Sequence, residues 1–282
     1  MATRIIIDST ADTTEKVRSR LTVIPLTIHF GEEEYLDGVT MNGRQFYEKL
    51  IESDVLPTTS QVSPYVFSQE FQKVVDAGDE AVVLTISSGL SGTYQSACIA
   101  AEDFPGKIYV VDSQNVTIVT GILAEYALRL CDEGKKAAEI AEILEEKKNE
   151  VQLVAMLDTL EYLKKGGRIS KTAAVAGSLL SIKPVVTLKD GGVAVIGKAR
   201  GSRQANNMLA QCIEKAGGVD FDMPLLLGYT GMEDSLLQKY IADSSSMWTD
   251  QRDSLPTTQI GSVVGTYAGP GCIGVAYFPR KK

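Results

Sequence analysis

The chain has 282 residues, of which 44% are hydrophobic and 23% are charged, which is enough for about two folded domains with ordinary cores. Its net charge of -8 argues against nucleic-acid binding, which needs a basic face. No apolar run approaches the roughly 20 residues that span a bilayer, and the N-terminus lacks a signal-peptide pattern, so we expect a cytoplasmic protein.

The first half of the chain alternates short apolar runs with helical patterns. The predicted strands are 4–8, 23–30, 81–87 and 107–113. The predicted helices are 42–53, 63–78, one from Ser91 onward, and a long stretch at 115–149 broken near Gly134. This alternation favours a mostly parallel sheet with helices on both faces. We therefore expect an N-terminal α/β domain at 1–150.

The pattern changes after residue 150. The predicted elements are a strand at 151–158, a helix of small residues at 169–182, a hairpin at 183–200, a helix at 202–217, a strand at 223–230, another helix and a final strand at 271–278. The hairpin turn is expected at Asp190-Gly191-Gly192, because glycine supplies the positive φ of tight turns. We predict a C-terminal α/β domain at 151–282 with a mixed sheet, packed on the first domain with a ligand cleft between them.

Residues 85–97, "TISSGLSGTYQSA", join a predicted strand to a predicted helix. The stretch breaks the G-x-S-x-G nucleophile elbow, and the single histidine, His29, comes too early for that fold and is interpreted as a packed strand residue. The Walker motif and G-x-G-x-x-G are absent. A Gly/Ser loop entering a helix still offers N–H groups and hydroxyls to an anion. The alternative is that Ser91 is only a helix N-cap.

Other loops supply further donors. Residues 56–64 are rich in hydroxyls, Arg168 follows two glycines, and residues 261–271 hold Thr266 and Tyr267 in a glycine-rich turn. Together they offer many hydroxyls and one arginine, but no acid or base suited to catalysis. Such a set is better suited to holding an anion than to transforming it, so no catalytic residue is assigned.

A metal or redox site is not predicted. The four cysteines lack CxxC spacing and a neighbouring histidine, and we interpret them as small buried hydrophobic residues. We therefore expect neither a metal nor a cofactor.

Seven motifs in order resemble the DegV family of fatty-acid-binding proteins, the acyl-carrying subunits of bacterial fatty acid kinase. They are "IIIDSTADT", "LPTTSQVSP", "TISSGLSGTYQSA", "DTLEYLKKGGRIS", "GSLLSIKPVVTLKDGGV", "KARGSRQA" and "IGSVVGTYAGPGCIGVAY". The resemblance covers the whole chain. It implies a bacterial, cytoplasmic, non-catalytic lipid-binding protein of phospholipid metabolism, with a fatty acid and a kinase catalytic subunit as partners, and allows transient membrane contact.

The resemblance also implies site residues. The carboxylate would be held by Thr59 and Ser91, with Arg168 near the head group, and Tyr267 stands where the family usually has histidine. Unlike histidine, a phenol cannot become a cation at neutral pH, although it can donate a hydrogen bond. Secondary head-group candidates are Thr58, Gly92 and Thr266, and candidates for docking the kinase are Arg200 and Arg203.

Two functions are carried forward. In the first, the protein binds a long-chain fatty acid and presents its carboxylate to a separate ATP-dependent kinase, with the tail buried at about 0.8 kcal/mol per CH₂. The small residues of 169–182 would either let the tail slide past or simply pack tightly. In the alternative, an enzyme acts on a small anionic substrate at the Ser91 loop, using the strand-end pairs Asp8/Ser9 and Asp112/Ser113. The usual role of such pairs is to cap the following turn.

Overall fold

The apolar runs of the first half form a four-stranded sheet in which every strand is parallel to its neighbours. In spatial order the strands are β2 (Thr22–Ile24), β1 (Thr3–Asp8), β6 (Glu80–Thr85) and β7 (Ile108–Asp112). Ile5 and Ile7 pack on one face of this sheet and Ile6 packs on the other. Both faces are covered, which is why these strands are apolar throughout rather than alternating. The predicted parallel sheet is confirmed.

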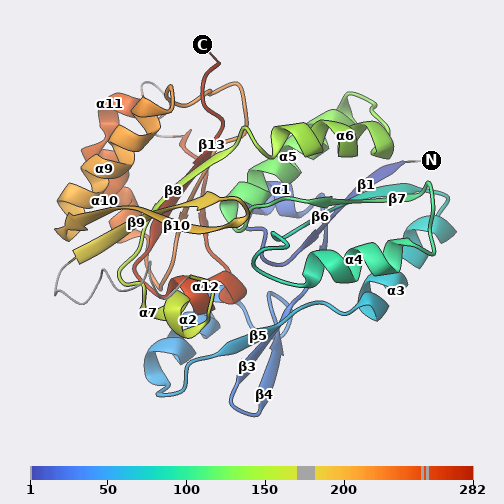
Figure 1. Cartoon of the computed structure of the whole chain (residues 1–282), viewed down its shortest axis with the longest axis horizontal. Helices are drawn as coiled ribbons and strands as arrows, with labels where there is room; N and C mark the ends of the chain where they lie inside the picture. The colour runs from blue at the N-terminus through green and yellow to red at the C-terminus, as the bar shows by residue number, and fades with distance from the viewer. Residues whose placement is uncertain (1, 170–181, 249–250, 252–253, 282) are drawn as a thin grey trace.

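Helices cover both faces of this sheet (Figure 1). The helices of the first half are α1 (Glu15–Arg18), α2 (Gly43–Glu52), α3 (Pro64–Asp76), α4 (Thr93–Ala101), α5 (Ile118–Asp132) and α6 (Ala137–Lys147). α3 and α4 pack on the Ile6 face, and α5 and α6 pack on the opposite face. The long helical stretch breaks as predicted, because Gly134 takes a φ of +82° between α5 and α6.

The single strand predicted at 23–30 is wrong. It is two strands, because Pro25 has no N–H with which to continue the ladder beyond β2. β3 (Thr27–Phe30) instead pairs antiparallel with β4 (Glu33–Leu36) and β5 (Thr58–Ser60) in a small separate sheet. Thr59 therefore lies on a strand and not in the predicted loop.

The second half forms a six-stranded sheet. Its strands, in spatial order, are β10 (Gly192–Arg200), β9 (Ile182–Lys189), β8 (Gln152–Met156), β13 (Ile273–Tyr277), β11 (Leu226–Tyr229) and β12 (Thr257–Gln259). All neighbours are antiparallel except β11 and β12, so the predicted mixed sheet is confirmed. Asp190 and Gly191 form the hairpin turn with φ of +50° and +75°.

The two faces of this second sheet have different neighbours. Its helices are α7 (Glu161–Lys165), α9 (Gly201–Lys215), α10 (Ser235–Asp243), α11 (Ser245–Trp248) and α12 (Ser262–Ala268). Val154 and Met156 of β8 pack with α9, whereas the alternate residues Leu153 and Ala155 face a cavity toward the first domain. In Figure 1, α9, α10 and α11 lie on the outer side of this sheet, and α5 lies toward the parallel sheet.

The computed structural model describes residues 2–169, 182–248, 251 and 254–281. The predicted small-residue helix at 169–182 falls almost wholly on 170–181, outside the described residues. Within the described part, no helix is both long enough and apolar enough to cross a membrane.

Helix α12 comes late in the chain but is anchored on the first domain. Val263 belongs to the same core cluster as Phe46 of α2, and the Tyr47 hydroxyl donates to the Ile260 carbonyl at 2.9 Å. A Cβ on Gly265 would lie 2.6 Å from the Tyr47 hydroxyl oxygen, so only glycine permits this close approach. The helix therefore connects the two domains beside the cavity.

Candidate functional site

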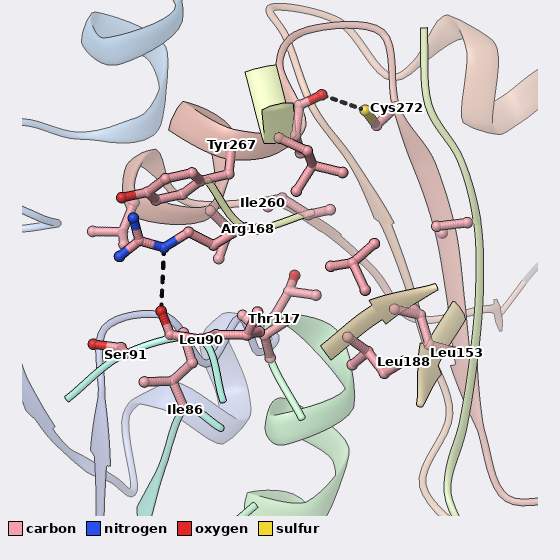
Figure 2. Close-up of a pocket in the computed structure, with 18 of the residues that line it drawn as sticks. Ile86, Leu90, Ser91, Thr117, Leu153, Arg168, Leu188, Ile260, Tyr267 and Cys272 are labelled. Carbon is pink, nitrogen blue, oxygen red and sulfur yellow. Dashed lines mark hydrogen bonds between the residues drawn. The ribbon is translucent and has the colours of Figure 1, made fainter. Parts of the chain in front are cut away.

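A cavity of about 410 Å³ lies between the two domains. Most of its wall is apolar, and Ser91, Arg168 and Tyr267 lie together at the end shown on the left of Figure 2. The apolar lining residues include Leu26, Ile86, Leu90, Val116, Ile118, Leu153, Ala155, Leu157, Leu163, Val186, Leu188, Val193, Ile260, Val263, Val264, Ala268 and Ile273. The polar lining residues include Thr59, Ser60, Gln61, Ser91, Thr117, Arg168, Thr187 and Tyr267. The site therefore combines a long apolar wall with one polar end, which we call the mouth.

The Ser91 loop leads from the end of β6 into α4. Helix α4 begins at Thr93 with Gly92 at the cap position, so Ser91 is not the N-cap itself. Its hydroxyl oxygen still accepts the Thr93 N–H at 3.3 Å and lies 3.0 Å from the Thr93 hydroxyl. Ser91 and Gly92 both line the cavity. A Cβ at Gly92 would lie 2.1 Å from the Gln61 Oε1 atom, so a larger residue there would require the Gln61 amide to move.

Two strand-end carboxylates hold this loop in shape. Asp8 accepts the Ile86 N–H at 2.7 Å, and Asp112 accepts both the N–H and the hydroxyl of Ser88. Each also caps its own turn, through the N–H groups of Thr10 and Gln114. Burial raises the pKa of Asp8. Neither carboxylate lines the cavity.

The strand ends that carry Asp8 and Asp112 are not neighbours in the sheet, because β6 runs between β1 and β7. Asp8 accepts backbone N–H groups from the segments after β1 and β6, and Asp112 accepts them from the segments after β6 and β7. They therefore shape the Ser91 loop, and the enzymatic alternative loses the acids on which it depended.

Thr59, Arg168 and Tyr267 meet at the mouth of the cavity, although they are far apart in the sequence. The hydroxyls of Thr59 and Tyr267 lie 2.7 Å apart, and the Arg168 guanidinium lies 4.8 Å from the centre of the Tyr267 ring (Figure 2). A Cβ on Gly166 would lie 2.3 Å from a carbon of that ring, so the first glycine of "KKGGRIS" makes room for the tyrosine. Such a cation–π contact contributes about 0.5–2 kcal/mol.

Arg168 crosses from one domain to the other. Its Nε donates to the Leu90 carbonyl at 3.2 Å, and its Nη1 donates to the Gly166 carbonyl at 2.8 Å (Figure 2). No carboxylate within the described ranges forms an ion pair with it. The guanidinium therefore keeps an uncompensated charge and unused donors beside the Thr59 and Ser91 hydroxyls, an arrangement suited to an anion.

The remaining predicted residues lie elsewhere. Thr58 is exposed, and Thr266 is buried and donates to the Ser262 carbonyl at 3.0 Å; neither lines the cavity. Arg200 and Arg203 are exposed at the end of β10 and in the first turn of α9, and they also do not line it. His29 lies in β3, with its Nε2 2.7 Å from the Ser60 hydroxyl, outside the lining as its interpretation as a strand residue predicts.

Sequence reasoning missed several lining residues. Gln61 lies at the mouth and donates to the Ser96 hydroxyl at 3.0 Å; its place in "LPTTSQVSP" was the available signal. Cys272 lines the cavity, and its Sγ donates to the Ala268 carbonyl at 3.1 Å. Burial raises the pKa of Cys272 to about 11, so it is a neutral thiol and a poor nucleophile at neutral pH. Among the described residues, no group of three or more His, Cys, Asp or Glu residues could hold a metal ion.

Comparisons with known proteins agree with this architecture. The family model described as "Uncharacterised protein, DegV family" matches residues 2–280. A DegV domain-containing protein from Clostridium acetobutylicum is 34% identical over 98% of each chain.

Two solved structures extend the likeness to three dimensions. A DegV family protein from Thermus thermophilus, described by its fatty acid binding, has a TM-score of 0.87 at 30% identity, over 99% of this chain and 100% of its own. A stearic acid-binding protein from Eubacterium ventriosum has a TM-score of 0.85 at 26% identity, over 99% and 98%. With the family match spanning nearly every residue, the chain belongs to the DegV family.

Proposed function

We propose that the protein binds a long-chain fatty acid, with the tail in the apolar part of the cavity and the carboxylate at the mouth. The observation that carries this proposal is the Arg168 charge, unpaired within the described residues and set beside the Thr59 and Ser91 hydroxyls at one end of an otherwise apolar wall. The Thermus thermophilus and Eubacterium ventriosum relatives, whose descriptions name fatty acid or stearic acid binding, support it.

The apolar wall of the cavity suits the tail of such a ligand, and the polar mouth suits its carboxylate. Each methylene removed from water contributes about 0.8 kcal/mol, so ten of them offer roughly 8 kcal/mol before ordering costs. A buried carboxylate needs donors, because burying an unpaired charge costs far more free energy than burial of the tail provides. One proton of the Thr59–Tyr267 hydroxyl pair joins the two oxygens, and the other is free to donate to the ligand.

We also propose that the protein is a carrier without catalytic residues, which presents the carboxylate to a separate ATP-dependent fatty acid kinase. Arg200 and Arg203 are the proposed docking residues, since both are exposed and neither forms an ion pair within the described part of the chain. This role fits a cytoplasmic bacterial protein of phospholipid metabolism that contacts membranes transiently. Residue 150, between α6 and β8, is the proposed domain boundary.

Exchange of bound lipid tests the head-group role. Ser91→Ala should release a fluorescent long-chain acid about threefold to tenfold faster than the natural protein, which is the usual effect of one neutral hydrogen bond. Ser19→Ala, which removes an exposed serine hydroxyl bonded to the Lys16 carbonyl, is the matched control and should change nothing. Unchanged occupancy and release in Ser91→Ala would remove Ser91 from the head-group site.

The docking role needs a separate experiment. Arg200→Glu and Arg203→Glu should lower kinase-dependent formation of acyl phosphate while leaving lipid affinity unchanged, because neither side chain lines the cavity. Full phosphorylation by the kinase with both arginines reversed would contradict the docking assignment.

A further inference from the structure

Two buried carboxylates of the first domain lie where α12 begins. Asp12 and Asp37 are 6% and 5% exposed. An Asp12 oxygen accepts the Gly261 N–H at 2.8 Å, and an Asp37 oxygen accepts the Ser262 N–H at 3.3 Å. The first N–H groups of a helix have no partner within the helix, so these carboxylates supply what the short helix α12 lacks.

Asp12 also holds a second wall of the cavity. Its other oxygen accepts the Thr117 hydroxyl proton at 2.6 Å, at the point where α5 begins. Thr117 and Ile118 line the cavity from that side, and Val263, Val264 and Tyr267 line it from α12. One carboxylate therefore links two separate lining segments.

The contact is close and is reinforced on both sides. A Cβ on Gly261 would lie 3.1 Å from the bonded Asp12 oxygen, which is a tight contact, so glycine favours the close approach of the backbone to Asp12. The Thr258 hydroxyl donates to the Thr13 carbonyl at 3.0 Å just before this point. The segment that carries Tyr267 is thus attached to the first domain by a series of hydrogen bonds.

We propose that Asp12 and Asp37 are positioning residues of the head-group site, which fix the start of α12 so that Tyr267 meets Thr59 and Arg168. The identity of the ligand depends on the proposed function, whereas the role of the two carboxylates in placing α12 does not. The two carboxylates do not line the cavity, so they act only through the segments that they hold.

Hydrogen–deuterium exchange of the full chain tests the placement without any ligand. Asp12→Ala should speed exchange of the amides of 261–268 about tenfold, because it removes a buried acceptor. Asp12→Asn should stay within about twofold of the natural protein, because an amide can accept from Gly261 and donate to the Thr117 oxygen. Glu80→Ala is the matched control, since this buried carboxylate holds α6 through the Ala137 N–H and should leave 261–268 unchanged.

Release of cis-parinaric acid, a fluorescent long-chain acid, tests the link to Tyr267. Asp12→Ala and Tyr267→Phe should each speed release, and the double variant should be slower than the product of the two single effects, because Asp12 acts partly through the tyrosine and partly through Thr117. Should Asp12→Ala fail to fold, Asp37→Ala, which removes the 3.3 Å bond to the Ser262 N–H and leaves the Asp12 bonds to Gly261 and Thr117 in place, substitutes for it in both experiments.

The outcomes separate this proposal from the proposed function. Unchanged exchange at 261–268, a failed Asn rescue, or release rates that multiply in the double variant would each overturn the positioning role. A natural protein that takes up no parinaric acid, with α12 still loosened by Asp12→Ala, would contradict the proposed function and support the placement.

Discussion

The two ends of the cavity are built in different ways. The interior uses regular structure: the alternate residues Leu153 and Ala155 of β8, residues 186–188 of β9, and the first turn of α5. The mouth uses ends and loops: Thr59, Ser91, Arg168 and Tyr267 come from β5, from the Ser91 loop, from the segment after α7 and from α12. A single sheet face supplies a large apolar area, whereas several donors converge on one point only where several segments of the chain meet.

The two ends of the cavity should therefore contribute differently to ligand binding. For the proposed fatty acid, the interior would bury many methylenes with little directional demand, so it should supply most of the affinity. The mouth offers a few hydrogen bonds of about 1 kcal/mol each and one charge, so it should set the orientation of the ligand and distinguish an acid from other lipids. The four predictions below test this division, from the largest expected effect to the smallest.

Filling the interior should have the largest effect. Ala155→Phe places a ring against the cavity wall of β8 and should displace about four methylenes, at roughly 3 kcal/mol or about a hundredfold in affinity for a 16-carbon acid. Displacement of a fluorescent acid measures it. An 8-carbon acid is the control ligand and should lose less than about fivefold. Equal losses for both acids would mean that the tail does not reach this wall.

Asp12, which holds the start of α12 beside the mouth, is a buried ionisable group, unlike the apolar residues of the interior. The free energy of unfolding should therefore depend on pH. Burial raises the pKa of Asp12 from 3.8 to about 7, against the hydrogen bonds from Thr117 and Gly261; the Asp37 charge raises it further and Arg18 lowers it. The folded protein then keeps a proton that the unfolded chain releases, so the cost of burying Asp12 grows as the pH rises from about 4 to 7.

Asp12→Asn removes this cost. Its melting temperature relative to the natural protein should be about 5 °C higher at pH 8 than at pH 5, which corresponds to roughly 2–3 kcal/mol. Thermal unfolding at the two pH values measures the difference. An identical increment at both would show that Asp12 does not bind a proton in this range.

Removing the charge at the mouth should come next. Arg168→Ala should weaken binding of a long-chain acid about thirtyfold, or roughly 2 kcal/mol, because it loses a charge-assisted contact. The methyl ester of the same acid is the control ligand and should bind both proteins alike, and Arg200→Ala is the control variant. A loss that is equal for acid and ester would assign Arg168 to loop structure, through its bond to Leu90, rather than to the carboxylate.

The phenol should have the smallest effect. Tyr267→Phe should weaken binding about fivefold, as expected for one neutral hydrogen bond. Because the Tyr267 and Thr59 oxygens lie 2.7 Å apart, adding Thr59→Ala should cost less than in the natural protein. Calorimetry of the two single variants and the double variant measures this coupling, and fully additive losses would contradict a shared role.

Much of the fold could be predicted from the sequence, for a physical reason. The strands of the parallel sheet are short continuous apolar runs, and helices such as α2 begin at recognisable caps, here Asn42 with Gln45 in a capping box. The small sheet could be predicted only in part: β3 lies within the strand predicted at 23–30, whereas β4 and β5 have three or four largely polar residues, none of them buried. The pairing of β3 with β5 joins residues such as Ile28 and Thr59, which are far apart in the sequence, and local patterns do not record it.

The site divides in the same way. Thr59, Ser91, Arg168 and Tyr267 lie in separate loops or short elements. Their donor chemistry suggested an anion site, but only the resemblance to a family assigned them to one carboxylate before the structure showed that they line one cavity. The cavity wall could not be recognised in the sequence, because β8 is apolar on both faces and a cavity wall has the same composition as a core. Asp12 lay within a quoted motif, but its contact with Gly261 spans 249 positions.

The most direct test of the central claim is mass spectrometry of the freshly purified protein under non-denaturing and denaturing conditions, with lipid extraction from the same sample. The account predicts one long-chain fatty acid per chain, present before denaturation and released by it. A protein that carries none, and takes up none when incubated with 16- and 18-carbon acids, would contradict fatty acid binding and leave the cavity to a different anion.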